Sequence, residues 1–474
     1  MVLKMLGAAY GYFPTEYTVH IAGALIALLA THRIAQGRKT TRERDMHARV
    51  VVVTGGFTPL GLTLLESLAA RGAHIIALTP LPVADPRVAT YIDLLRSTTQ
   101  NEEIYAEECD LSDPASVHAF AKRFVLGNTG GAPSTPAGAA TAGPSAAGGP
   151  QRLDALVFAH EYAGVGALPL FASGSPTQRE LEQRTRDTAA LASFLLTTLL
   201  LPAMLTAPAE RDLRIVHVVN RWYAAAGPRF FLDNLYSFGE QTTPTSPLLP
   251  EASRALRTAL FTRHLQRILD ALPAPSAVPD PSGAVPAQKK SNIVAVSVSP
   301  GLSRVETVGP LFGVGVGGGG NWLGALFYVL LYPLFLLLTK SAAASVQSVL
   351  HVLFVPTVGK LSKTPKTSAD AKEEEDEALL PGALYAECAV VRTPAIAPPP
   401  PTTTTPPNST SNAGKEKTTQ TGVKQEEGDE VETDDERAGR LVWEAYEAGL
   451  RTWEAANPSA PAKAKADEGA DTSS

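Results

Sequence analysis

The sequence predicts an α/β fold of the Rossmann type, in which helices cover both faces of a doubly wound parallel sheet. From Ala48 onward, short segments made almost wholly of aliphatic residues alternate with longer helical segments. Continuous apolar strands are typical of a parallel sheet that is buried on both faces. The first strand also ends in a glycine-containing turn, "VTGGFTPLG", that opens a helix. These observations favour a single domain with disordered insertions and a disordered tail.

The strands and helices are expected in the alternating order of this fold. The strand "RVVVV" precedes the helix "PLGLTLLESLAARG", and the strand "HIIALTP" follows that helix. A helix closing on "DLLRSTTQ" leads to the strand "EIYAEECDL". Further buried strands are expected at "DALVFAH", "RIVHVVN" and "NIVAVSVSPG". The segment Glu251–Leu269 has the pattern of an ordinary amphipathic helix. The predicted domain covers residues 48–392.

Three insertions and a tail depart from this pattern. The insertions are residues 127–150, 273–290 and 365–377, which are rich in Gly, Ala, Pro and Ser or carry the charge run "KEEEDE". The tail, residues 393–474, is acidic and contains "PPPPTTTTPP". Segments of low hydrophobicity and high charge cannot offset their chain entropy, so we expect them to stay unfolded. A short helix near 440–453 is expected to dock back, and the acidic tail is a candidate contact for a protein partner.

Charge and cysteine content exclude several classes of function. The formal charge is −6, which gives no electrostatic basis for binding nucleic acid. The two cysteines, Cys109 and Cys388, form neither a disulfide framework nor a metal cluster, and they suit a reducing compartment. No HExxH or HxxxH pattern occurs, so we expect no metal site.

The first 47 residues are predicted to form a membrane-anchor region. Tyr17–Thr31 is an apolar run, although it is short for a span of ~17–25 residues. The basic segment "GRKTTRERD" follows it and favours the cytosolic side, so the main domain is expected to face the cytosol. The organelle is undetermined. A buried or surface helix of the globular unit is the alternative interpretation.

A second apolar segment, Asn321–Leu338, has 18 residues and no charge. This length is at the edge of what a span requires, and Pro333 would kink a spanning helix. Three interpretations stay open: a second span, a segment lying in the membrane interface, and a buried core helix. Membrane lipid and a lipophilic small molecule are therefore the expected partners.

The glycine turn carries a resemblance to a known family. "VTGGFTPLG" resembles the TGxxxGxG turn of short-chain dehydrogenases/reductases, in which backbone amides and a helix N-terminus meet a pyrophosphate. Thr54, Gly55 and Gly61 match that pattern. Pro59 stands at the middle glycine, where it adds a ring and removes an amide donor. The resemblance implies NAD or NADP as cofactor, and Pro59 puts the binding in question.

Two further segments extend this resemblance. "CDLSD" resembles the end of the family's third strand, where an aspartate contacts adenine, and Asp110 matches it. "SVSPGLSRVET" resembles the PGxxxT segment beside the nicotinamide, with Pro300 and Gly301. The second strand ends in "ALTP", which offers neither an acidic residue nor an arginine, so NAD and NADP are not distinguished. "FLDNL", "TKSAAASVQSVLHVL" and "GALYAECAVV" resemble segments of the retinol-dehydrogenase-like branch.

The resemblance implies four catalytic positions, and this chain departs from the family at each of them. The family uses a tyrosine, a lysine four residues later, a serine and an asparagine. The flanking residues assign these positions to Pro250, Arg254, Asn220 and Ala189. Proline has no acid or base, and the pKa of arginine is too high to relay protons. Arg254 retains a charge at the position that holds the cofactor ribose. Loss of a positioned acid/base removes about 10²- to 10⁴-fold of rate.

Surrogate groups are conceivable at two places. Tyr223 follows Asn220 by three residues and Tyr236 lies in the following loop, but packing or solvent exposure is the simpler interpretation of both. His160 and Glu161 are adjacent at a strand end, where local hydrogen bonding is favoured over acid/base work.

Two functions therefore follow from the sequence. The favoured one is a membrane-associated, catalytically impaired member of the family with a binding or scaffold role. The alternative is an active NAD(P)-dependent oxidoreductase acting on a lipophilic alcohol or ketone of the retinoid, steroid or fatty ketone type.

Overall fold

A computed structural model describes residues 17–126, 152–163, 165–172, 176–208, 210–226, 248–272, 291–314, 321–357, 378–394 and 434–458. Its centre is an eight-stranded sheet in the order β3-β2-β1-β4-β5-β6-β7-β8. All neighbouring strands are parallel except β7 and β8. The strands are β1 (Val50–Thr54), β2 (His74–Thr79), β3 (Ile104–Glu108), β4 (Ala155–Phe158), β5 (Leu213–Val218), β6 (Ile293–Ser299), β7 (Leu384–Ala386) and β8 (Ala389–Val391). The predicted doubly wound Rossmann-type sheet is confirmed.

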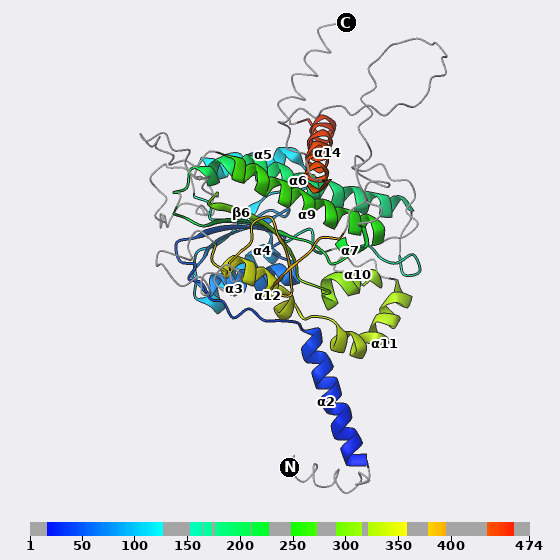
Figure 1. Cartoon of the computed structure of the whole chain (residues 1–474). Coiled ribbons are helices and arrows are strands. Elements are labelled where there is room, and N and C mark those ends of the chain that lie inside the picture. The colour runs from blue at the N-terminus through cyan, green and yellow to red at the C-terminus, as the bar shows by residue number, and fades with distance from the viewer. Residues whose placement is uncertain are drawn as a thin grey trace, which may run out of the picture.

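Helices cover both faces of the sheet, as Figure 1 shows. The described helices are α2 (Thr18–Ala35), α3 (Pro59–Ala69), α4 (Pro86–Thr99), α5 (Pro114–Val125), α6 (Pro176–Leu205), α7 (Tyr223–Ala226), α9 (Leu248–Ala271), the π-helix η3 (Arg304–Val308), α10 (Gly309–Leu311), α11 (Trp322–Leu338), α12 (Ala342–Phe354) and α14 (Asp434–Ala456). One buried cluster joins the sheet to α3, α4 and α12, and the other joins it to α5, α6, α9 and α14. Alternation along a strand divides the side chains between them: Val52 belongs to the second cluster, and Val51 and Val53 to the first.

Three of these helices begin with the same local device. Each has a proline in its first turn and a capping side chain just before it: Thr58 for α3, Asp85 for α4 and Asp113 for α5. Proline costs no hydrogen bond at this position, and the capping oxygen accepts from an amide that the helix leaves unpaired. Pro59 therefore starts α3 without disturbing it.

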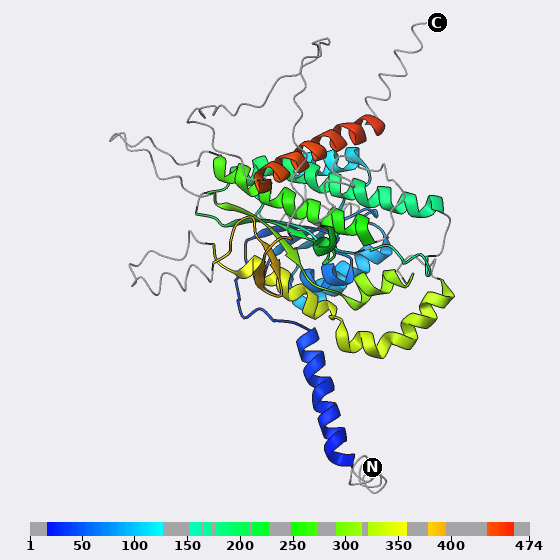
Figure 2. The same cartoon turned by 45° about the vertical axis from the view of Figure 1, so that its right-hand side comes forward.

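The helix predicted at Glu251–Leu269 forms as α9, but the expected amphipathic character is wrong. Most of its residues are buried, including Glu251, Arg254 and Arg257. The sheet packs against one side of α9 and α14 packs against the other (Figure 2). Trp443 of α14 stacks on Phe261 with ring centroids 5.6 Å apart. The two covers leave only a few side chains of α9 partly exposed, among them Arg263 at 24% and Arg267 at 33%, and the sequence does not reveal the second cover.

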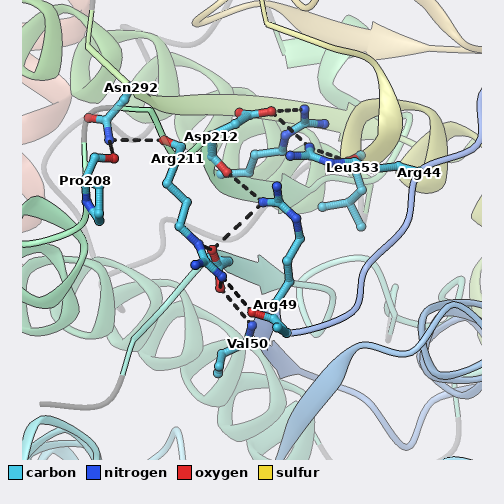
Figure 3. A network of polar contacts seen from close by, with 11 residues as sticks. Arg44, Arg49, Val50, Pro208, Arg211, Asp212, Asn292 and Leu353 are labelled. Carbon is cyan, nitrogen blue, oxygen red and sulfur yellow. Dashed lines mark hydrogen bonds and ion pairs between the residues drawn. The ribbon is translucent and has the colours of Figure 1, made fainter. Parts of the chain in front are cut away.

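A network of ion pairs closes the amino-terminal edge of the sheet (Figure 3). Asp212 pairs with Arg44 at 2.9 Å and with the buried Arg214 at 2.7 Å. Asp154 pairs with Arg211 and accepts a hydrogen bond from the Val50 amide at 2.9 Å. Arg44 belongs to the segment that connects α2 to β1, so this network fastens that segment to the domain.

The two apolar segments outside the core lie next to each other. Figures 1 and 2 show α2 projecting from the body, with α11 near the point where α2 joins it. The His32 ring nitrogen Nδ1 lies 3.1 Å from the carbonyl of Leu336, and Gln36 donates to the carbonyl of Thr339 at 3.0 Å. None of the residues of α2 is buried, and Gly324 is the one buried residue of α11. The interpretation of residues 321–338 as a buried core helix is therefore wrong.

Two helices are long and apolar enough to cross a membrane: α2, and residues Glu180–Leu205 within α6. The α6 segment is 61% buried, whereas α2 is 0% buried. We interpret α6 as a core helix, because it packs against α5, α9 and α14. The insertions 127–150, 273–290 and 365–377 and the tail before α14 lie outside the described residues. α14 includes residues 440–453, where the sequence predicts a helix.

Candidate functional site

The turn between β1 and α3 has the tight geometry that its glycines predict. Gly55 has a φ of +66°, and a Cβ there would lie 2.6 Å from the amide nitrogen of His160. A Cβ on Gly61 would lie 2.1 Å from the carbonyl oxygen of Gly55. Both positions therefore require glycine, the first for its backbone conformation and the second because helix and turn pack directly together. Thr54 ends β1 fully buried, with its hydroxyl 2.7 Å from Nδ1 of His160.

The amides of the first turn of α3 are used within the chain. Pro59 has none. Leu60 donates to Oε1 of Glu306 at 3.1 Å, and Gly61 donates to the hydroxyl of Thr58 at 3.1 Å. Leu62 donates to the carbonyl of Thr58 at 2.7 Å. In this arrangement the turn does not fit a phosphate group unless Glu306 is displaced.

Glu306, which the sequence patterns do not single out, contacts the glycine turn. It lies in η3, after β6, and only 4% of its surface is exposed. Burial raises the pKa of its carboxyl, and the hydrogen bond from the Leu60 amide only partly offsets that effect. Glu306 lies within "SVSPGLSRVET", the segment that resembles the nicotinamide site. The contact with Leu60 spans 246 positions and has no local signature.

The other predicted cofactor residues lie along the same carboxyl edge of the sheet. Asp110 follows β3, and its Oδ1 accepts from the amide of Ser112 at 2.8 Å, which forms a local turn. Gly301 follows β6 with a φ of +101°, and its carbonyl accepts from the Tyr162 hydroxyl at 3.0 Å. The carbonyl of Pro300 accepts from Nζ of Lys340 at 2.9 Å.

Arg254 lies inside a closed ion-pair cluster. Its guanidinium bonds to Oδ1 of Asp187 at 3.1 Å and to Oε2 of Glu251 at 2.6 Å. The second carboxylate oxygen of Glu251 pairs with Arg186 at 2.9 Å. Burial on its own would lower the pKa of Arg254, but the two carboxylates outweigh burial and raise it. Its neighbours thus engage this cation from both sides, and no sequence pattern predicts Asp187 and Glu251 as its partners.

The remaining predicted positions do not add an acid or a base. Pro250 is buried in the first turn of α9, and Ala189 is in α6. Asn220 is buried after β5, and its side-chain oxygen accepts from the amide of Trp222 at 3.0 Å. Tyr223 is 6% exposed, and burial raises the pKa of its hydroxyl. Tyr236 lies outside the described residues.

His160 and Glu161 take part in local hydrogen bonding. Glu161 accepts from the hydroxyls of Ser193 at 2.7 Å and Thr258 at 2.8 Å. Burial lowers the pKa of His160, although the carboxylate of Glu161 opposes that shift. The pair connects β4 to α6 and α9, so its hydrogen bonds hold the helices against the sheet. Among the described residues, no group of three or more His, Cys, Asp or Glu side chains could hold a metal ion.

Comparison with known proteins supports the predicted family. A family model described as the KR domain matches residues 49–127, which include β1, the glycine turn and β3. The uncharacterized oxidoreductase pbr1 of Schizosaccharomyces pombe is 28% identical over 75% of this chain and 83% of its own length. The uncharacterized oxidoreductase YNL181W of Saccharomyces cerevisiae is 27% identical over 76% of this chain and 82% of its own length. Retinol dehydrogenase 12 of Mus musculus is 33% identical over 19% of this chain and 27% of its own length.

The comparisons support membership of the chain in the short-chain dehydrogenase/reductase superfamily. They agree with the predicted family and support an oxidoreductase-like function and NAD(P) binding in general terms. The match to retinol dehydrogenase 12 agrees with the predicted branch, but it covers 89 residues.

Proposed function

We propose that this chain is a membrane-associated, catalytically impaired short-chain dehydrogenase/reductase with a binding or scaffold role. The observation that carries this proposal is the state of Arg254. Its side chain, 5% exposed, is paired with Asp187 and Glu251, so it does not face a reacting group. Pro250, four residues earlier, supplies no proton donor.

The loss of both groups matters because they would act together. A tyrosine hydroxyl has a free pKa near 10, and a neighbouring cation is what brings such a hydroxyl into the working range. Here the assigned tyrosine position has no hydroxyl and the assigned cation is already neutralised by two carboxylates. Asn220 still offers a side-chain amide, which can donate a hydrogen bond but cannot transfer a proton.

The test of this proposal is turnover by the purified full-length protein. We expect no hydride transfer from NADPH or NADH to retinal, a steroid ketone or a fatty ketone, followed as loss of absorbance of the reduced nicotinamide. Turnover with any of these at rates typical of enzymes, about 1 s⁻¹ or faster, would defeat the proposal.

The second candidate is an active oxidoreductase on a lipophilic alcohol or ketone. The observation that favours it is the retained geometry of the glycine turn at Gly55 and Gly61, together with relatives whose names describe oxidoreductases. The same turnover experiment separates the two candidates. The first candidate function includes a protein partner that binds the acidic tail. Capture of a protein by the isolated tail sequence tests this part of the proposal.

Membrane association is proposed to use α2 as the anchor and α11 as a helix lying in the interface, with the domain facing the cytosol. α11 starts at Trp322, which is 75% exposed, and bears many other exposed apolar side chains. These are Leu326, Phe327, Val329, Leu330, Tyr332, Leu334, Leu336 and Leu338. Its 17 residues correspond to about 25 Å, less than the ~30 Å of the hydrocarbon core.

Fluorescence quenching by brominated lipids tests this placement. In vesicles, Trp322→Phe is expected to remove most of the quenched emission, whereas Trp453→Phe on α14 leaves it unchanged. A tryptophan introduced by Leu330→Trp in the Trp322→Phe background then reports the depth of the helix centre. Strongest quenching by bromine near the headgroup supports an interfacial helix, and strongest quenching by bromine near the chain end contradicts it.

A further inference from the structure

The N-terminus of α3 is where an α/β fold of this type presents amides to an anion. α3 has 11 residues, and Leu60, Gly61 and Leu62 follow its first-turn proline. Thr58 satisfies Gly61 and Leu62. The remaining amide, that of Leu60, donates to Glu306. The carboxyl group of Glu306 therefore already occupies the place in the turn where a bound anion would accept from the Leu60 amide.

Glu306 is held at this position by its own segment. The Ser303 hydroxyl accepts from the amide of Glu306 at 3.4 Å, and the amide of Thr307 donates to the carbonyl of Ser303 at 3.2 Å. These bonds form the first turn of η3 and direct the side chain toward α3. Glu306 is 4% exposed, and its second oxygen, Oε2, has no hydrogen-bond partner within the described ranges. A buried carboxylate oxygen without a partner is costly, which offsets part of what the bond to the Leu60 amide contributes.

The same physical effects attract a carboxylate and a phosphate to this turn. A helix N-terminus carries a partial positive charge and favours anions within its first turn. Two anionic groups at one helix end repel each other, and the repulsion is strong where water is excluded. A dinucleotide can reach the Leu60 amide only when the side chain of Glu306 leaves it.

We propose that Glu306 is an internal competitor that occupies the phosphate-binding turn and weakens the binding of NAD(P). This inference deepens the proposed function and rests on it, since it adds a further reason for impaired catalysis to those given by Pro250 and Arg254. It also attributes the weak binding of NAD(P) to Glu306 and not to Pro59. Proline at the first helical position removes one donor and leaves α3 intact, whereas Glu306 consumes the donor that remains.

Binding of reduced nucleotide by matched variants tests the proposal. The full-length protein in detergent is titrated with NADPH and with NADH, and nicotinamide fluorescence is followed. Glu306→Gln removes the charge but keeps an acceptor for Leu60, and Glu306→Ser removes both the charge and the occupant. Glu66→Gln, at an exposed position of the same helix, is the control for net charge. Thermal unfolding of each variant checks that the fold is retained.

We expect Glu306→Ser to bind NADPH about 10- to 100-fold more tightly than the wild type, because a like charge and an occupant are both removed from the turn. If Glu306→Gln also binds more tightly, the charge of Glu306 is what weakens binding. If only Glu306→Ser binds more tightly, the cause is the side chain that occupies the turn. Both results support the proposal. Unchanged affinity in both variants overturns it, as does equal tightening in Glu66→Gln.

The readout separates this inference from the proposed function. The proposed function fails if the wild type transfers hydride, whatever the affinity of the variants. The inference about Glu306 fails if the variants bind no more tightly, whatever the turnover. Tighter binding without turnover in Glu306→Ser is the result expected when both hold, because Pro250 still supplies no proton.

Discussion

The two edges of the sheet both contain buried charges, but the charges have different consequences. At the amino edge, Asp212 joins Arg44 and Arg214, and so fastens the segment behind α2 to β5. At the carboxyl edge, Arg254 is enclosed by Asp187 and Glu251, and Glu306 occupies the turn before α3. The first cluster connects segments of the chain. The second occupies the place where a parallel α/β sheet binds its ligand.

This difference teaches that burial and pairing do not by themselves distinguish a structural cluster from a blocked site. A buried ion pair contributes little net stability relative to apolar residues, yet removal of one partner is strongly destabilising. The place of a buried ion pair in the fold decides whether it is interpreted as a structural cluster or as a blocked site. Ion pairs at the amino edge are distant from any ligand position of this fold, whereas those at the carboxyl edge replace a ligand's contacts with contacts inside the chain.

The largest expected effect is at the amino edge. Asp212→Ala leaves the guanidinium of Arg214, whose side chain is 2% exposed, without its carboxylate. We expect a loss of about 3–5 kcal/mol in the free energy of unfolding, because one charge of a buried pair is left uncompensated. Urea denaturation measures it. The matched control is Arg123→Ala, which breaks a surface pair with Glu107 and should cost about 1 kcal/mol or less.

A similar change at the carboxyl edge should be smaller. Arg254→Met leaves Asp187 without the guanidinium, but Glu251 retains Arg186 at 2.9 Å. We expect a loss of about 2–4 kcal/mol in the free energy of unfolding, and no change in turnover, because the proposed function predicts no turnover in the wild type. Urea denaturation and a hydride-transfer assay measure the two quantities. An activity present in the wild type and abolished by this variant would show Arg254 to be catalytic.

Comparison of these edges also shows what the sequence can predict. The strands, the glycine turn and the residues Thr54, Gly55 and Gly61 followed from short patterns that depend on neighbours in the chain. Glu306 could not be predicted, because its partner Leu60 lies 246 positions away. The buried state of Arg254 could not be predicted either, because its partner Asp187 lies 67 positions away in α6 and because α14, near the end of the acidic tail, covers α9. Without knowledge that α14 packs on α9, the charged residues of an apparently amphipathic helix are expected to face solvent.

A third prediction concerns a buried group that has no opposite charge paired with it. His217 in β5 is fully buried and stacks on Phe158 with ring centroids 4.6 Å apart. Burial lowers its pKa to about 4, although the carboxylate of Glu161 acts in the opposite direction. Below pH 6.5 the unfolded chain therefore binds a proton that the folded chain does not, and stability is lost as the pH falls toward 4.

His217→Phe should remove that part of the pH dependence, because phenylalanine keeps the stacking and does not titrate. Between pH 6.5 and 4, we expect His217→Phe to lose less free energy of unfolding than the wild type, by up to about 3 kcal/mol. Urea denaturation across this pH range measures the difference. His118→Gln, at an exposed site paired with Glu454, is the control. A pH profile that His217→Phe leaves unchanged would contradict the assignment.

The central claim is that the chain closes its own nucleotide turn. Hydrogen exchange of the segment from Val53 to Leu65, measured by mass spectrometry with and without NADPH, tests it most directly. We expect NADPH at about 1 mM, a concentration corresponding to roughly −4 kcal/mol of binding free energy, to leave exchange of this segment unchanged in the wild type. In Glu306→Ser we expect NADPH to slow exchange of the same segment. Protection of the wild-type segment by NADPH at micromolar concentration would show that Glu306 does not block the turn.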